Sequence, residues 1–259
     1  MSILKKLPAM TKEFTQSSTD TEKSTPHKER HTGHNVFIRD SIIGFADGLT
    51  VPFALTAGLS ALGNSKIAFL GGLAELFAGS ISMGLGAYLA AVTERKHYEV
   101  EERREWKEVK ECPQAEEQEI FEIFDRYGIS RDASKGIVDG LKVNEDMWVQ
   151  FMMDFELKLE KPAVRMAWIE GLVMGLSYFF GGLLPMIPYF AFKHNVNHAL
   201  FTSIGITGIV LLAFGYTKAL VTGTSHRDAA WSAIQTLMIG ALAAGVSYGI
   251  VRGVNESIE

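Results

Sequence analysis

The residues best suited to chemistry in this sequence are glutamates, and they are concentrated between residues 99 and 125. Two pairs in this run have a three-residue spacing, which places both carboxylates of a pair on one helix face. These pairs are Glu105 with Glu108 and Glu116 with Glu119. Pro113 lies between them, so the chain can turn there and bring the pairs face to face. Converging carboxylates repel one another unless cations or a metal ion lie between them.

A di-metal centre is one interpretation, because helix bundles hold such centres with carboxylates on facing helices. The alternative is a solvated charged face whose glutamates pair with the basic residues of the same helix. Those basic residues are Arg103, Arg104, Lys107 and Lys110. Further along, Met152 and Met153 precede Glu156 by four and three residues, so both sulfurs can flank one carboxylate. Thioether with carboxylate suits a borderline ion such as Fe²⁺, although packing would explain the methionines equally well.

Three more carboxylates, Asp47, Glu75 and Glu170, lie within long apolar stretches. An ionisable group in hydrocarbon costs at least about 2.5–3.5 kcal/mol on insertion scales, so it usually faces a pathway or a partner. Pro52 cannot donate a backbone bond, which leaves the carbonyl of Gly48 free beside Asp47 as a second oxygen for a cation. The alternative for Asp47 and Glu75 is a protonated or hydrogen-bonded buried carboxyl. Glu170 is expected to extend to the membrane interface.

Met83 lies beside a stripe of small residues at four-residue spacing, formed by Ala78, Ser82 and Gly86. Such a stripe lets another helix approach closely. A thioether is a soft ligand that transition metals accept, but Met83 alone fits packing as well. Zinc-finger, protease, P-loop and nucleophile-elbow motifs are absent from the sequence, which argues against ATP hydrolysis and favours a gradient as the energy source.

The elements that would position these residues are long apolar helices. A helix needs about 20 residues to cross about 30 Å of hydrocarbon, and five stretches meet that length. They run from 41 to 62, 67 to 91, 166 to 192, 199 to 220 and 229 to 251. We therefore expect an all-α integral membrane protein with five transmembrane helices and a cytosolic helical metal-binding subdomain between helices two and three.

The expected domain order places residues 36–92 in helices one and two, 93–161 in the subdomain and 162–252 in helices three to five. A disordered polar tail, 1–35, precedes them, and a short tail, 253–259, follows. In the subdomain, the second span should continue as one helix to Lys110, because that stretch lacks Pro and Gly. Three further helices are expected over 115–127, 130–142 and 145–159.

Orientation follows from lysine and arginine, which are frequent in the tail and in 93–161. The positive-inside rule puts both in the cytosol and the C-terminus in the lumen. The net charge of −5 and the acidic middle segment argue against a nucleic-acid partner. The single cysteine, Cys112, excludes an intramolecular disulfide.

Five stretches of the sequence together resemble one known family, the vacuolar iron transporters. They are RDSIIGFADGLTVPFAL (39–55), AGSISMGLGAYLA (78–90), FMMDFEL (151–157), EKP (160–162) and GGLLPMIPY (181–189). The resemblance extends over about residues 34–252, and the combination of stretches is what makes it specific.

The resemblance implies a homodimer in a vacuolar or equivalent organelle membrane that exchanges cytosolic Fe²⁺ for protons. It implies a translocation pathway between the subunits, with Asp47 and Met83 matching pathway positions and Glu75 matching less closely. It also implies that the cytosolic metal ligands are Glu105, Glu108, Glu116, Glu119, Met152, Met153 and Glu156.

The main hypothesis is therefore a proton-coupled Fe²⁺ transporter without enzymatic activity. Mn²⁺, Zn²⁺ or a broader set of divalent ions is the alternative cargo, because carboxylates accept several ions. A membrane-anchored, ferritin-like store or sensor is the alternative of another class, which would not need Asp47 or Met83 within the spans. A di-iron oxidase fits less well, because the expected Glu-x-x-His pairs are missing.

Overall fold

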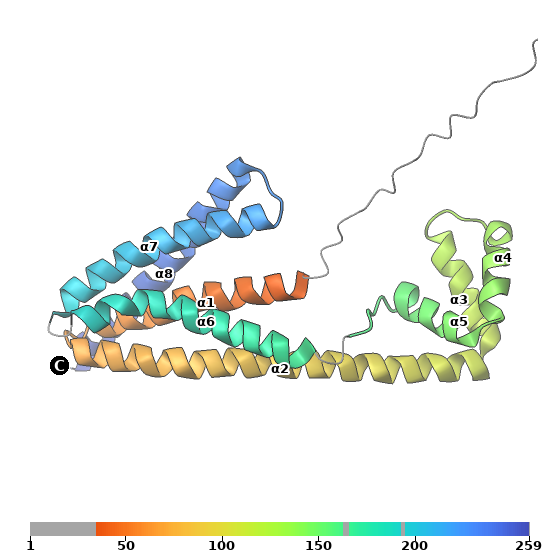
Figure 1. Ribbon diagram of the computed structural model, residues 1–259, viewed down its shortest axis with the longest axis horizontal. Helices are drawn as coiled ribbons and strands as arrows, with labels where there is room; N and C mark the ends of the chain where they lie inside the picture. The colour runs from red at the N-terminus through yellow and green to blue at the C-terminus, as the bar shows by residue number, and fades with distance from the viewer. Residues whose placement is uncertain (1–34, 163–165, 193–194, 259) are drawn as a thin grey trace, which may run out of the picture. The chain divides into compact units, whose positions relative to one another are not determined.

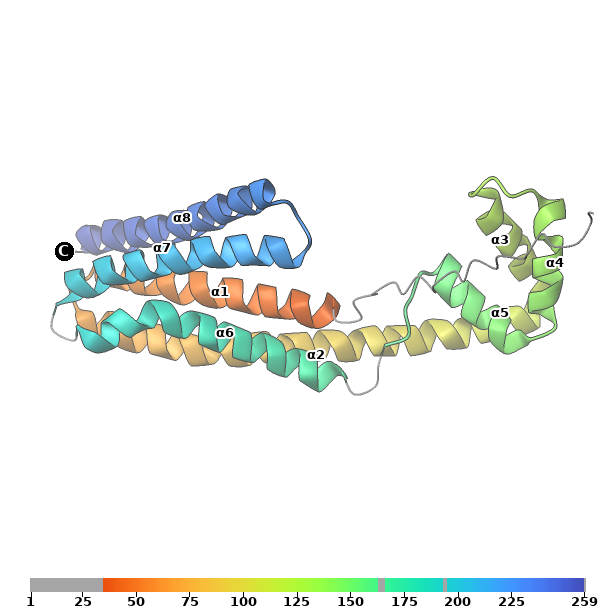
Figure 2. The same ribbon diagram turned by 45° about the horizontal axis from the view of Figure 1, so that its top comes forward.

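The computed structural model describes residues 35–162, 166–192 and 195–258, and every element in these ranges is helical. Five helices are long and apolar enough to cross a membrane, which confirms the predicted count and the all-α class. They are α1 (Asn35–Ser60), α2 (Ser65–Glu111), α6 (Met166–Ala191), α7 (Val196–Val221) and α8 (His226–Ile258). Figures 1 and 2 show them side by side as one bundle. The expected disorder of the N-terminal tail lies outside the described residues.

Helices α1, α2 and α6 pack tightly because glycines remove side chains where they cross. A Cβ atom on Gly48 of α1 would lie 2.2 Å from the carbonyl oxygen of Tyr178 in α6. A Cβ atom on Gly79 of α2 would lie 2.5 Å from the Tyr178 hydroxyl oxygen. Neither position can accept a larger residue without moving a backbone or an aromatic ring. The two glycines therefore fix α1 and α2 against the same residue of α6.

Helix α2 is 47 residues long and continues well beyond the apolar part of the sequence. It begins at Asn64, whose side chain accepts hydrogen bonds from the backbone N–H groups of Lys66 and Ile67. It ends at Glu111, just before Pro113, as the sequence predicts, and the next helix begins at Pro113, two residues before the predicted start at 115. A single rigid helix thus carries both the residues of the second span and the first glutamate pair.

The segment between α2 and α6 folds back on the end of α2 as a small helical domain, which we call the acidic domain (residues 93–161). Its elements are α3 (Pro113–Asp125), α4 (Arg131–Lys142), α5 (Glu145–Phe151) and the π-helix η1 (Met152–Glu156). Figure 2 shows α3, α4 and α5 grouped around the end of α2. Ile120, Val138 and Trp148 are buried in its hydrophobic core.

Several boundaries differ from the prediction, and two of the differences are large. The expected helix 145–159 is interrupted, because residues 152–156 adopt a π-turn in which Leu157 N–H donates to the Met152 carbonyl at 3.1 Å. The chain then leaves the helix at Lys158, whose φ of 55° is in the left-handed region. Helix α8 continues to Ile258, beyond the predicted end of the fifth span at 251.

Candidate metal sites

The five predicted glutamate ligands of the acidic domain converge from three elements. Helix α2 supplies Glu105 and Glu108, α3 supplies Glu116 and Glu119, and η1 supplies Glu156. They form two triads, in each of which one carboxylate oxygen per residue lies within 4.8 Å of the other two: 105, 108 and 116, and 116, 119 and 156. Glu116 belongs to both triads, so the five residues form one site, which we call the glutamate cluster.

Burial makes this cluster costly without a cation. Glu105 is 1% exposed and Glu116 is 4% exposed. Both carboxylate oxygens of Glu105 and one oxygen each of Glu116 and Glu156 have no hydrogen-bond partner among the described residues. Unpaired buried carboxylates destabilise a fold unless they are protonated or bind a cation. This observation favours an ion site over the alternative of a solvated charged face.

Burial and neighbouring carboxylates also raise the pKa values of three glutamates in the cluster. Burial, followed by the charge of Glu108, raises the pKa of Glu105 to about 7. Burial and then Glu105 raise the pKa of Glu116 to about 7, and burial and then Glu119 raise the pKa of Glu156 to about 8. These three carboxyls therefore hold protons near neutral pH, and a divalent cation that binds them must displace those protons.

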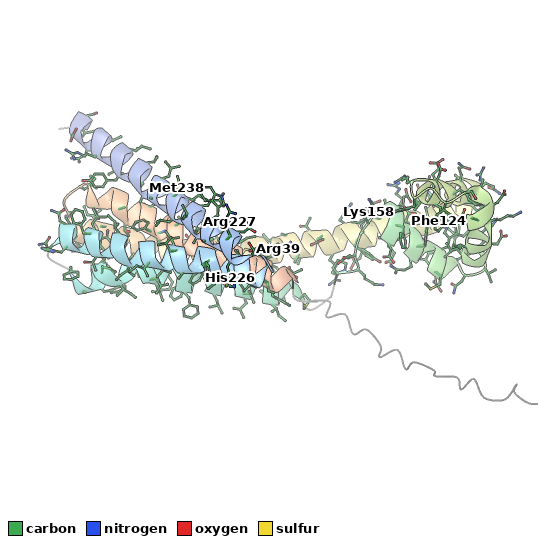
Figure 3. The ribbon with its side chains drawn as sticks, turned by 90° about the horizontal axis from the view of Figure 1, so that it is seen from above. Arg39, Phe124, Lys158, His226, Arg227 and Met238 are labelled. Carbon is green, nitrogen blue, oxygen red and sulfur yellow. The ribbon has the colours of Figure 1, made fainter. Side chains whose placement is uncertain are left out.

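Met152 and Met153 lie at the start of η1, on the same π-turn as Glu156. Both are fully buried in the core of the acidic domain, where they pack with the residues around Val138. Packing accounts for their burial, so a ligand role for the two sulfurs stays a prediction. Figure 3 shows Phe124 and Lys158, which come from α3 and the segment after η1, in the same small domain.

The predicted pathway residue Glu75 contacts a residue that sequence reasoning missed. The Tyr178 hydroxyl of α6 donates a hydrogen bond to Oε1 of Glu75 in α2. Asp47 lies next to Gly48, the residue at which α1 crosses the backbone of Tyr178, so α1 brings its carboxylate to the same level of α6. The second oxygen of Glu75 is buried and has no hydrogen-bond partner among the described residues. We call Asp47, Glu75 and Tyr178 the span site.

Asp47 is exposed on the surface of this single chain, and Met83 is half-buried. The neighbours of Asp47 one turn away on α1, Ile43 and Val51, are also exposed. A carboxylate cannot face hydrocarbon without a large cost. The face of α1 that carries Asp47 therefore needs cover from another polypeptide surface or from water.

A second missed carboxylate, Asp40, lies seven residues before Asp47 and so on the same face of α1. It is 1% exposed; its Oδ1 accepts from Arg39 Nε at 3.1 Å, and its Oδ2 has no partner among the described residues. Glu170, near the start of α6, is half-buried, and its extension to the membrane interface stays a prediction. The seven-residue spacing from Asp47 could have identified Asp40. It was overlooked because the predicted span begins at Ser41, one residue after Asp40.

Comparison with known proteins identifies a family and several similar sequences. Residues 38–252 match the model of the VIT family. The chain is 47% identical over 229 residues to "Vacuolar iron transporter 1" of Oryza sativa subsp. japonica, covering 88% of this chain and 89% of that protein. It is 41% identical over 247 residues to "Vacuolar iron transporter 1" of Arabidopsis thaliana, covering 94% and 97%. It is also 36% identical over 220 residues to "Protein CCC1" of Saccharomyces cerevisiae, covering 83% and 68%.

Proposed function

This chain belongs to the VIT family, and on that premise we propose that it moves Fe²⁺ from the cytosol into the vacuole or an equivalent store. The observation that carries the proposal is the course of α2, a single helix from Ser65 to Glu111. Its apolar part bears Glu75 and Met83, and its far part bears Glu105 and Glu108 of the glutamate cluster. Capture residues and passage residues are thus joined by one rigid element.

The division of work follows from the chemistry of the two sites. The glutamate cluster offers several oxygens, which suits reversible capture of a divalent cation. Asp47, Glu75 and Met83 offer few ligands, so an ion is held there weakly enough to leave. Asp40, at the start of α1, is the intermediate step on the same helix face as Asp47. Met152 and Met153 add soft ligands at the cluster, which favours Fe²⁺ over Ca²⁺ or Mg²⁺.

A homodimer is the arrangement that best covers the exposed face of the spans. Asp47 is exposed on α1, and Ala78, Ser82 and Gly86 form an exposed small-residue stripe on α2. No atom lies within 4 Å of a Cβ placed on Gly86, so a second helix has room to approach there. A pathway between two copies would then place Asp47 and Met83 in its wall.

The positive-inside rule gives the orientation in the membrane. Arg39 at the start of α1 and Arg227 at the start of α8 lie at the same end of the bundle (Figure 3). The acidic domain extends from α2 at that end and carries many further lysines and arginines. The N-terminus and the acidic domain are therefore cytosolic, and the end of α8 is lumenal.

Proton antiport is the energy source that fits these carboxylates, because each can hold either a proton or a metal ion. The test is uptake by vesicles reconstituted with the full chain, with and without an inside-acid pH gradient. We expect Fe²⁺ uptake to rise with the gradient and internal pH to rise as Fe²⁺ enters. Uptake that ignores the gradient would remove the antiport mechanism.

The same vesicles distinguish the alternatives when Fe²⁺, Mn²⁺, Zn²⁺ and Ca²⁺ are compared. Equal uptake of Fe²⁺ and Mn²⁺ would widen the cargo to divalent ions in general. Binding of Fe²⁺ without any uptake would identify a membrane-anchored metal store or sensor, and the transport proposal would be wrong.

A further inference from the structure

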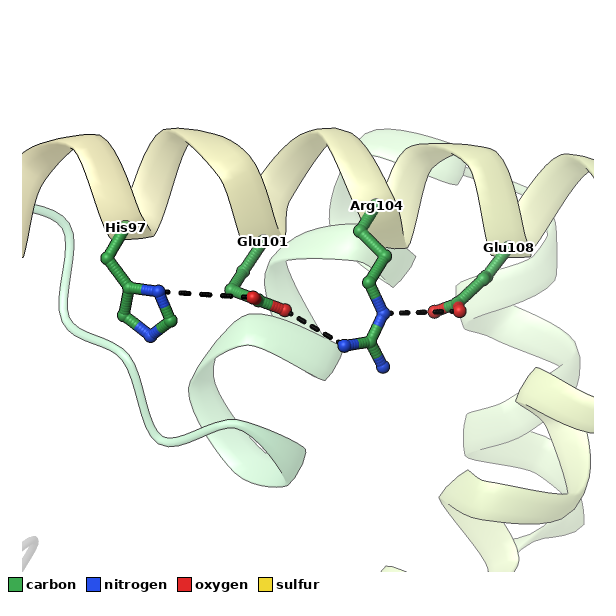
Figure 4. Close-up of polar contacts among 4 residues, drawn as sticks. All are labelled: His97, Glu101, Arg104 and Glu108. Atoms are coloured by element: carbon green, nitrogen blue, oxygen red, sulfur yellow. Dashed lines mark hydrogen bonds and ion pairs between the residues drawn. The ribbon is translucent and has the colours of Figure 1, made fainter.

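A row of alternating basic and acidic side chains runs along the far part of α2 and ends in the glutamate cluster (Figure 4). His97 Nδ1 lies 3.9 Å from Oε1 of Glu101. Arg104 Nη1 lies 3.2 Å from Oε2 of Glu101, and Arg104 Nε lies 3.2 Å from Oε1 of Glu108. Arg104 thus bridges one carboxylate outside the cluster and one inside it.

Arg104 is distinctive because its charge reaches further into the cluster than this one contact. In the part of the chain that the structure describes, Arg104–Glu108 is the one ion pair within 4.0 Å that involves a cluster glutamate. The Arg104 charge also acts on Glu105 and Glu116, where it lowers the pKa against the larger effect of burial. The negative charge of the cluster is therefore partly neutralised by a side chain of its own helix.

A metal ion and the Arg104 guanidinium would compete for the carboxylate of Glu108. A divalent ion in the triad of Glu105, Glu108 and Glu116 takes carboxylate oxygens at about 2.0–2.6 Å. Two positive groups on one carboxylate repel each other. The Arg104 side chain is 55% exposed, so it can move into water and keep its contact with Glu101 when Glu108 turns to the ion. The geometry thus provides an alternative partner for each group.

We propose that Arg104 is a resident counter-ion of the glutamate cluster, which holds Glu108 when the cluster is empty and competes with the divalent cation for it. The inference rests on the proposed function, because it takes the cluster to be a metal site. Arg104 is a positioning residue that touches the ligand Glu108 and not the metal. Its effect is to weaken metal binding and to speed release, which serves a site that must pass its ion on.

The simpler account is a surface ion pair of helical spacing, which contributes little to stability and nothing to metal binding. Arg103 gives a matched control for that account. It is the neighbouring arginine on the same helix, and its Nε donates to the backbone carbonyl of Glu99 at 2.9 Å. Arg103→Gln and Arg104→Gln remove the same charge from adjacent positions, and the second change alone removes the bridge to Glu108.

The experiment is equilibrium binding of Fe²⁺ under anaerobic conditions to the full chain in lipid nanodiscs, at pH 8 and at low and high salt. We expect Arg104→Gln to bind Fe²⁺ about two- to fivefold more tightly than the native chain, the range for a partly exposed ion pair. Arg103→Gln should change affinity less, and Arg104→Lys should stay near the native value. Salt should shrink the Arg104→Gln effect, because the opposition is electrostatic. Release of Fe²⁺ into excess chelator should be slower from Arg104→Gln.

The outcomes separate this inference from the function on which it rests. If the native chain binds no Fe²⁺, the cluster is not a metal site and the proposed function loses its capture step. If the native chain binds Fe²⁺ and Arg104→Gln binds it equally or more weakly, or if Arg103→Gln has the same effect, Arg104 is not a competing counter-ion. An effect that is unchanged by salt would identify a structural role for Arg104 and would also overturn the inference.

Discussion

The glutamate cluster and the span site use the same functional group in opposite ways. The cluster gathers five carboxylates from three elements and leaves several of their oxygens without partners. The span site has two carboxylates, and one of them, Glu75, is held by the Tyr178 hydroxyl. Many ligands near water favour capture, whereas few ligands within the membrane limit both the cost of burial and the strength of binding. If the proposed function is right, the number of ligands, more than their type, distinguishes the capture site from the passage site.

The largest effect on metal binding is expected at Glu116, the residue shared by both triads of the cluster. We expect Glu116→Gln to weaken Fe²⁺ binding by at least about 10- to 100-fold, because that range is found for loss of a residue that only supports a metal ligand. The metal-free fold should be as stable as the native one or more so, because a buried acid with a raised pKa is replaced by a neutral group of the same shape.

Isothermal titration and thermal unfolding of the same samples measure these two effects. Glu122→Gln is the matched control, since Glu122 is an exposed glutamate of α3 that bonds to Gln118 at 3.0 Å. Loss of binding accompanied by a large loss of stability would show that Glu116 has a structural role.

The Fe²⁺ affinity of the glutamate cluster should depend on pH. Burial raises the pKa of Glu105 to about 7 and of Glu156 to about 8. Fe²⁺ must displace these protons, so affinity should rise from pH 6 to pH 8, by up to about tenfold per pH unit for each proton displaced. Proton release on binding at pH 7, measured by titration in buffers of different ionisation enthalpy, checks this directly.

The stability of the metal-free chain should fall as pH rises, whereas its Fe²⁺ affinity should increase. The folded pKa values of these carboxyls lie above the ordinary value of 4.5, so their contribution is most favourable below that pH. Stability is then lost as pH rises from about 4.5 to about 8. Thermal unfolding across this window in the presence of a chelator measures it. A metal-free chain that gains stability over the same window would contradict the pKa values.

A smaller effect is expected at Tyr178 in the span site. Tyr178→Phe removes the hydrogen bond to Glu75 and leaves its carboxylate less well positioned, at a cost of about 1–3 kcal/mol for a buried group that loses its partner. We expect a severalfold slower uptake with unchanged Fe²⁺ binding at the cluster. Tyr189→Phe is the control, because Tyr189 is also on α6 and its hydroxyl contacts Ser60 at 2.9 Å. Equal slowing in both variants would reduce Tyr178 to a packing residue.

Sequence spacing predicted the cluster better than it predicted the span site. Three-residue spacing and Pro113 were enough to bring the two glutamate pairs together, because both depend on local helix geometry. The contact between Glu75 and Tyr178 joins residues 103 positions apart, and no local pattern reports it. The π-turn at 152–156 was missed for another reason, since hydrophobic spacing cannot distinguish it from one more α-helical turn. Helix count and helix class followed from apolar length alone.

The most direct test of separate capture and passage is Asp47→Asn, with Fe²⁺ binding and Fe²⁺ uptake measured on one reconstituted preparation. Asp47 is on α1 and outside the glutamate cluster, so binding should stay within about twofold of the native value while uptake falls by more than about tenfold. Asp47→Glu, which keeps a carboxylate, should retain part of the uptake. Native uptake in Asp47→Asn, or loss of binding together with uptake, would contradict the division of work between the two sites.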